Sequence, residues 1–122
     1  MNIPRLPDAE LMIMNIIWHE NREITSADIA KILASEKDWS ITTILTFLSR
    51  LVERGFLTMR KDGRVNMYKA AIPEAAYIES ESKSFLARLH GNSLTSLVAA
   101  LYDGKAISKD DLDELREFID RR

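Results

Sequence analysis

Five hydroxyl side chains and one arginine lie close together in the segment SITTILTFLSR, which runs from Ser40 to Arg50. Hydroxyl groups donate hydrogen bonds to phosphate oxygens and donate or accept at base edges, and a threonine methyl can contact the methyl of thymine. No carboxylate occurs between Ser40 and Val52, although 19 of the 122 residues are Asp or Glu. Because an anionic partner would repel acids, this composition favours DNA as the partner; a solvated polar face is the alternative.

A helix running to about Arg54 would give this segment two faces, because successive residues are separated by about 100° of rotation. One face is apolar and is predicted to join the core: Ile41, Ile44, Leu48, Leu51 and Val52, with Leu45 at its margin. The opposite face holds the residues predicted to turn toward DNA: Thr42, Thr43, Thr46, Ser49 and Arg50. Gly55 is typical of a residue that ends a helix, and the helix N-terminus offers unpaired N–H groups to phosphate.

Two further helices are predicted before this segment. The first covers residues 8–19 with Asp8 as its N-cap, and the second follows a capping box formed by Thr25 and Asp28. A short β-like stretch, residues 23–25, lies between them. Three short helices are therefore expected in succession.

A hairpin is predicted after the third helix, because Asp62-Gly63 lies between two strand-like runs and is the strongest short-range signal for a two-residue turn. Arg60, Lys61 and Arg64 surround this turn. The tip of the hairpin would therefore carry positive charge that could follow a DNA backbone or enter the adjacent minor groove. Cations at a hairpin tip are also common solubility devices.

Helix, strand, helix, turn, helix and hairpin is the order of a winged helix-turn-helix domain, which we predict for residues 1–72. Residues 39–72 carry six Lys and Arg against two acids, whereas residues 1–38 and 73–122 are both net negative and the whole chain has a net charge of −2. A basic patch between acidic segments is expected when one face of a protein meets phosphates. The predicted fold class is mainly α (α+β).

Residues 73–122 are predicted to form a helical dimerisation domain of three amphipathic helices, the last starting at a capping box of Ser108 and Asp111. Three short apolar stripes cannot easily bury themselves alone, so we expect a homodimer interlocked through this segment. Folding back onto the winged helix is the alternative. The residues predicted for the dimer interface are Tyr77, Phe85, Leu89, Leu94, Leu97, Val98, Leu101, Leu112, Leu115 and Ile119.

The sequence does not suggest enzymatic or metal chemistry. It has no cysteine, and its two histidines, His19 and His90, lie in no nucleophile or metal-ligand motif. We therefore expect no catalytic residues, no metal site and no cofactor. The N-terminus lacks a signal-peptide pattern and no apolar run approaches about 18 residues, so we expect a cytoplasmic protein without membrane insertion. A winged helix that docks proteins without binding DNA is the competing class.

The chain resembles the penicillinase repressor (BlaI/MecI/CopY) family over nearly its whole length. The resemblance is carried by AELMIMNIIW, KDWSITTILTFLSRLVERGFL, KDGRVNMYKA, and SLVAAL followed by SKDDLDELREFI, in this order and spacing. It implies an N-terminal winged helix and a C-terminal dimerisation segment, in a dimer that represses resistance genes by binding operators with dyad symmetry. Copper sensing through the cysteine cluster of one branch is excluded because the chain has no cysteine, which favours the β-lactam-responsive branch.

The resemblance also implies roles for single residues. The positions that match operator contacts are Thr43, Thr46 and Arg50. The positions that match residues at or near the DNA backbone are Lys37, Ser40, Arg60, Lys61 and Tyr68. In the β-lactam-responsive branch a membrane-bound β-lactam sensor triggers cleavage of the C-terminal segment, and the corresponding bond here is Ala100-Leu101. Repression of an unrelated set of genes is the alternative.

Overall fold

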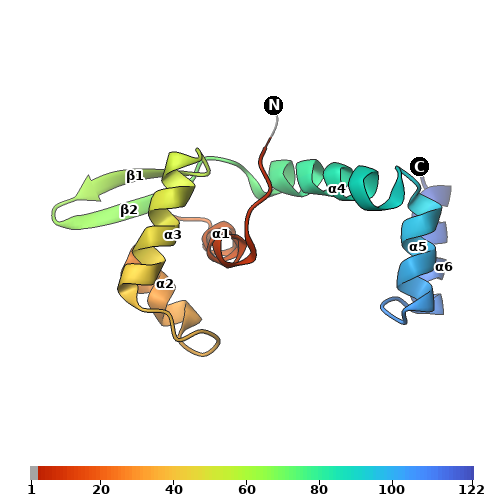
Figure 1. The fold of residues 1–122 in the computed structure, drawn as a ribbon, viewed down its shortest axis with the longest axis horizontal. Coiled ribbons are helices and arrows are strands. Elements are labelled where there is room, and N and C mark those ends of the chain that lie inside the picture. Colours follow the sequence, from red (N-terminus) through yellow and green to blue (C-terminus); the bar gives the residue numbers. More distant parts are fainter. Residues whose placement is uncertain (1–2) are drawn as a thin grey trace. The chain divides into compact units, whose positions relative to one another are not determined.

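The computed structural model describes residues 3–122, which form six helices and a two-stranded antiparallel sheet (Figure 1). These residues belong to two compact units, the first ending at Glu79 and the second covering Ser80–Arg122. The predicted order of three helices, a hairpin and three further helices is confirmed. The elements are α1 Asp8–Glu20, α2 Ser26–Leu33, α3 Ile41–Glu53, β1 Leu57–Asp62, β2 Val65–Ala70, α4 Glu74–His90, α5 Leu94–Asp103 and α6 Lys109–Asp120.

The core of the first unit lies among α1, α2, α3 and the hairpin. Its buried apolar side chains are Leu6, Ile13, Met14, Ile17, Ile24, Ile29, Leu33, Ile44, Leu48, Leu51, Phe56, Leu57, Tyr68 and Tyr77. The prediction that Ile44, Leu48 and Leu51 join the core is confirmed, since all three are fully buried. The same prediction was wrong for Ile41, which is 44% exposed because the first residue of α3 lies at the edge of the core.

The hairpin of β1 and β2 forms the wing. Asp62 pairs with Val65, so the turn residues are Gly63 and Arg64 rather than the predicted Asp62-Gly63. Gly63 has a φ of +67°, which glycine adopts without a Cβ clash, and Arg64 has a negative φ. This order of signs is that of a type II′ turn, which takes glycine at its first central position. Arg64 therefore lies at the tip of the wing itself.

The segment between α1 and α2 pairs with the wing. Ile24 forms an antiparallel bridge with Tyr68, and the two N–H···O hydrogen bonds measure 3.0 and 2.9 Å. The predicted β-like stretch is thus confirmed, as is the capping box at the start of α2. The prediction for the start of α1 was off by one residue: Pro7 is the N-cap and Asp8 is the first helical residue, where its carboxylate still favours the helix dipole.

The first unit extends beyond residue 72, where the predicted winged-helix domain ends. The side chain of Tyr77, on the first turn of α4, is 5% exposed, and its hydroxyl accepts a hydrogen bond from the Leu6 N–H at 2.9 Å. The Tyr77 ring lies 5.7 Å from that of Trp18, whose Nε1–H donates to the Ile72 carbonyl at 2.9 Å. Tyr77 therefore belongs to the core of this unit and not to the predicted dimer interface.

The second unit contains the part of α4 from Ser80 onward, together with α5 and α6. The Ser93 side chain caps α5, and Ser108 and Asp111 form the predicted capping box of α6. None of residues 80–122 is buried, and Leu89 is 64% exposed. In the single chain, the apolar residues predicted for the dimer interface in this unit are partly exposed: Leu89, Leu94, Leu101 and Ile119 are exposed, and Phe85, Leu97, Val98, Leu112 and Leu115 are half-buried. Across the part of the chain that the structure describes, no helix is long and apolar enough to cross a membrane.

Candidate nucleic-acid interface

Hydroxyl groups on the outer face of α3 are oriented by local hydrogen bonds. The Ser40 Oγ caps the helix, accepting from the Thr43 N–H at 3.1 Å and lying 3.1 Å from the Thr43 Oγ1. One turn later the Thr46 Oγ1 donates to the Thr42 carbonyl at 3.0 Å. Thr43 is half-buried and the other three side chains are exposed. Each of these hydroxyl oxygens can still accept a hydrogen bond from a partner, and the bonds within the helix fix the direction from which that partner must approach.

The N-terminus of α3 lacks the acids that other helices of the chain place there. α1, α2, α4 and α6 each have Asp or Glu in the first turn, where a carboxylate complements the helix dipole, whereas α3, like α5, has none. Lys37 is exposed shortly before the helix begins. The positive end of the α3 dipole is therefore left for an external anion such as a phosphate.

Arg50 extends from the same face and lies over an aromatic ring. Its Cζ is 6.0 Å from the centroid of Phe47, one turn earlier, and the Phe47 ring lies 5.2 Å from the ring of Trp39. This distance is at the outer limit of a cation–π contact, so the ring weakly favours guanidinium positions near its face. Sequence reasoning missed both aromatic residues; the i, i+3 spacing of Phe47 and Arg50 could have indicated the first, whereas no local pattern pointed to Trp39.

An ion pair between Glu10 and Arg54 fixes the C-terminal end of α3 to α1. The Glu10 side chain is 2% exposed, and its Oε1 accepts a hydrogen bond from the Arg54 Nη1. A carboxylate buried in this way requires a paired donor, so the contact constrains how α3 lies on the core. Sequence reasoning missed this pair, whose members are 44 residues apart.

The three cations predicted for the wing are not equivalent. Lys61 and Arg64 are exposed, and neither has an ion-pair partner among residues 3–122. Arg60 instead donates to Glu23 through two hydrogen bonds, Nε to Oε2 at 2.6 Å and Nη2 to Oε1 at 2.7 Å. These bonds hold the pKa of the Glu23 carboxyl below its usual range and raise the pKa of the Arg60 guanidinium. One wing cation is thus neutralised within the chain.

Tyr68 does not lie at the surface with the other residues predicted for DNA contact. Its side chain is 5% exposed and belongs to the core, while its backbone pairs with Ile24. We therefore assign Tyr68 to the packing of the wing and leave it out of the interface. The predicted contact residues whose side chains are exposed are Lys37, Ser40, Thr42, Thr46, Arg50, Arg60, Lys61 and Arg64.

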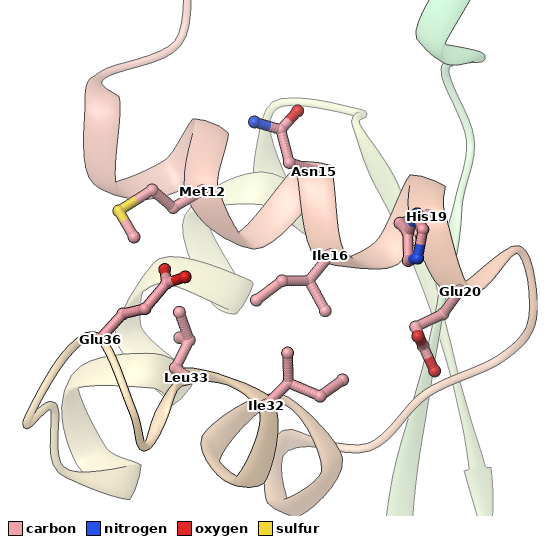
Figure 2. Close-up of a pocket in the computed structure, with 8 residues that line it drawn as sticks. All are labelled: Met12, Asn15, Ile16, His19, Glu20, Ile32, Leu33 and Glu36. Carbon is pink, nitrogen blue, oxygen red and sulfur yellow. The ribbon is translucent and has the colours of Figure 1, made fainter.

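A separate pocket of about 270 Å³ opens between α1 and α2, and Figure 2 shows its side chains projecting from the two helices and, for Glu36, from the turn that follows α2. Its lining residues are Met12, Asn15, Ile16, His19, Glu20, Ile32, Leu33 and Glu36. None of these is a residue predicted for DNA contact, and the lining holds two carboxylates and no Lys or Arg. The pocket is thus chemically distinct from the basic, hydroxyl-bearing face of α3.

Comparison with known proteins gives matches over nearly the whole chain. The family model described as penicillinase repressor matches residues 6–121. The penicillinase repressor of Bacillus licheniformis is 36% identical over 118 residues, which cover 97% of this chain and 91% of that protein. The methicillin resistance regulatory protein MecI of Staphylococcus aureus (strain N315) is 29% identical over 117 residues, which cover 96% of this chain and 94% of that protein.

Two of the similar solved structures are of the repressor BlaI. The solution structure of the DNA-binding domain of the repressor BlaI is 41% identical and covers 62% of this chain and 92% of that chain, with a TM-score of 0.55. The monomeric form of Bacillus licheniformis BlaI in complex with the blaP half-operator has the same identity and coverage and a TM-score of 0.53. The predicted winged-helix fold is confirmed, and with the match over residues 6–121 it follows that this chain belongs to the penicillinase repressor family, a family of DNA-binding repressors.

Proposed function

We propose that this DNA-binding repressor acts as a homodimer that reads operators of dyad symmetry with the outer face of α3 and the wing. The observation that carries the proposal is the exposed face of α3, which has no acidic residue. On this face Arg50 lies near the Phe47 ring, and the Thr46 hydroxyl is oriented by its hydrogen bond to the Thr42 carbonyl. The BlaI domain that matches this unit is bound to a half-operator in its solved complex, which supports the same use here. Action on DNA agrees with the predicted cytoplasmic location.

Dimerisation through the second unit is supported by its exposed apolar surface. Leu94 is 53% exposed and Ile119 is 56% exposed, in helices that bury no residue in the single chain. Burying such side chains against a second copy removes apolar area from water, which drives association. The residues that we assign to this interface are Phe85, Leu89, Leu94, Leu97, Val98, Leu101, Leu112, Leu115 and Ile119.

The salt dependence of binding tests this function. We expect the affinity for a duplex from the promoter of the chain's own gene to fall as salt is added. A plot of the logarithm of the binding constant against the logarithm of the salt concentration should have a slope of roughly −7, if each of two protomers neutralises about four phosphates and each phosphate contributes about 0.9. A scrambled duplex of equal length should bind far more weakly at physiological salt. Both are measured by fluorescence anisotropy over a salt series. Binding that is independent of salt, or no binding to the promoter duplex, would contradict this function, and the absence of binding would favour a winged helix that docks proteins.

We propose that the genes under its control are β-lactam resistance genes, because the relatives include a penicillinase repressor and a methicillin resistance regulator. We further propose that repression is relieved by cleavage of the C-terminal segment at Ala100-Leu101, after signalling by a membrane β-lactam sensor. Both residues are exposed in α5 of the single chain, and a cut there would separate α6 from the rest of the chain. Loss of α6 removes part of the proposed dimer interface and with it the avidity for DNA.

Cleavage is checked in cells that carry the sensor and are exposed to a β-lactam. Mass spectrometry of the tagged chain is expected to find a fragment that ends at Ala100, together with derepression of the adjacent gene. The untreated culture serves as the control and should contain only the intact chain. Derepression with the chain still intact would exclude this route of inactivation.

A further inference from the structure

The contact between Glu23 and Arg60 joins two segments that lie on either side of β2. Ile24, next to Glu23, pairs with Tyr68 on β2, and β2 pairs along its length with β1, which carries Arg60. The Arg60 side chain must therefore reach across β2 to place its Nε and Nη2 within 2.6 and 2.7 Å of the Glu23 carboxylate oxygens. Both oxygen atoms of the Glu23 carboxylate accept a hydrogen bond from Arg60, so the contact is bidentate, and we call this pair the clamp.

Strand alternation places this clamp on the side of the wing away from the core. Ile24 and Tyr68, which are bridge partners, are both buried. Their neighbours Glu23 and Lys69 therefore point to the opposite side, since successive side chains of an extended strand alternate. Lys69 also lowers the pKa of Glu23 through its charge, after the larger effect of the Arg60 hydrogen bond. Glu23 is thus an acid that faces two cations of the wing.

The ion pair between Glu23 and Arg60 is expected to contribute little to the stability of the fold. Its side chains are 55% and 32% exposed, and exposed ion pairs contribute little to the free energy of unfolding because solvent screens them. A bidentate contact does fix geometry, however, and it cancels the charge of a cation that would otherwise attract phosphates irrespective of sequence. The unpaired cations Lys61 and Arg64, nearer the tip of the wing, remain available to DNA.

We propose, on the basis of the function inferred above, that Glu23 is a positioning residue of the DNA interface that clamps Arg60 across β2 and withholds its guanidinium from the phosphates. The clamp holds the wing in place against the segment between α1 and α2. Because free arginine at this point would strengthen binding to any sequence, Glu23 also preserves the difference in affinity between operator and other DNA. Arg60 acts on the wing and not on DNA.

Salt series on the full chain with Glu23→Gln and with the double variant Glu23→Gln/Arg60→Gln test the clamp, using the promoter duplex and a scrambled duplex of equal length. Glu23→Gln frees Arg60, so we expect the slope to steepen by about 0.9 per protomer and binding to the scrambled duplex to tighten several-fold. Arg60→Gln alone would leave the Glu23 carboxylate without its partner, so the double variant Glu23→Gln/Arg60→Gln, which removes both charges of the pair, is the one that should keep the wild-type slope. Glu20→Gln is the matched control: it removes the same charge, but its partner Arg22 keeps a second carboxylate, Asp28, at 3.5 Å.

Nuclear magnetic resonance of the wild-type complex gives an independent measurement. The Arg60 Nε–H and the Glu23 side-chain carboxyl carbon should keep their chemical shifts when the promoter duplex is added. A slope that becomes shallower by about 0.9 per protomer in Glu23→Gln/Arg60→Gln, with shifts of both groups when DNA is added to the wild-type protein, would mean that Arg60 leaves Glu23 to bind phosphate, and would overturn the clamp. Wild-type protein that shows no salt-dependent binding to either duplex contradicts the proposed function itself, a result distinct from failure of the clamp alone.

Discussion

Replacing Arg50 with alanine is expected to weaken binding to the promoter duplex by roughly 10- to 100-fold per half-site, since one good side-chain contact to a base is worth about 1–3 kcal/mol. The guanidinium is exposed, has no ion-pair partner among residues 3–122, and lies 6.0 Å from the Phe47 ring centroid on the acid-free face of α3. Its removal leaves the buried residues of the helix untouched. The thermal midpoint should therefore stay within about 2 °C of wild type, because surface substitutions usually change stability little.

Two further variants show what the Arg50 result means. Arg88→Ala removes an exposed arginine from α4, outside the proposed interface, and should leave the affinity for the duplex unchanged. Phe47→Leu keeps the charge of Arg50 but removes the ring beneath it, so we expect a loss of only a few-fold, about 0.5–1 kcal/mol. Equal affinities of wild type and Arg50→Ala for promoter DNA would show that α3 does not read the operator.

Ending the chain after Glu79 is expected to give a folded monomer that binds promoter DNA roughly 10²- to 10⁴-fold more weakly than the full chain, because the avidity of two linked half-sites is lost. The cut follows the division between the two compact units and keeps Tyr77 with its core partners. Analytical ultracentrifugation gives the oligomeric state, and anisotropy gives the affinity. A fragment that remains dimeric would place the interface in the first unit and contradict the role proposed for the second.

A chain ended after Ala70 is the informative comparison, because this cut falls close to the predicted domain boundary but removes Tyr77. The Leu6 N–H would lose its acceptor, and the rings of Trp18 and Phe56 would lose contacts at 5.7 and 5.9 Å. Removing a buried aromatic side chain typically costs about 3–5 kcal/mol. We therefore expect this shorter fragment to unfold at lower urea concentration, as followed by tryptophan fluorescence. Equal midpoints for the two fragments would show that α4 contributes nothing to the first unit.

The sequence by itself determined those features that depend on residues three or four positions apart. Capping boxes in the sequence predicted the starts of α2 and α6. The helical spacing of Ile44, Leu48 and Leu51 identified the buried face of α3. Because the apolar residues occupy one side of α3, the same spacing placed its Thr and Ser side chains on the opposite side. Such features follow from the geometry of one helix, so they survive in any fold that contains it. Together with the turn signal of the hairpin and the order of the elements, they predicted a winged helix and the side of α3 that is open to a partner.

Tertiary structure alone decided which charges of the wing and of α3 are free. Arg60 and Glu23 are 37 residues apart, Arg54 and Glu10 are 44 apart, and Leu6 and Tyr77 are 71 apart. No local pattern links such residues, because each contact exists only once helices and hairpin have packed together. The sequence could therefore count the cations of the middle third, but only the packed fold shows that Arg54 and Arg60 are engaged within the chain while Arg50, Lys61 and Arg64 have no carboxylate partner among residues 3–122.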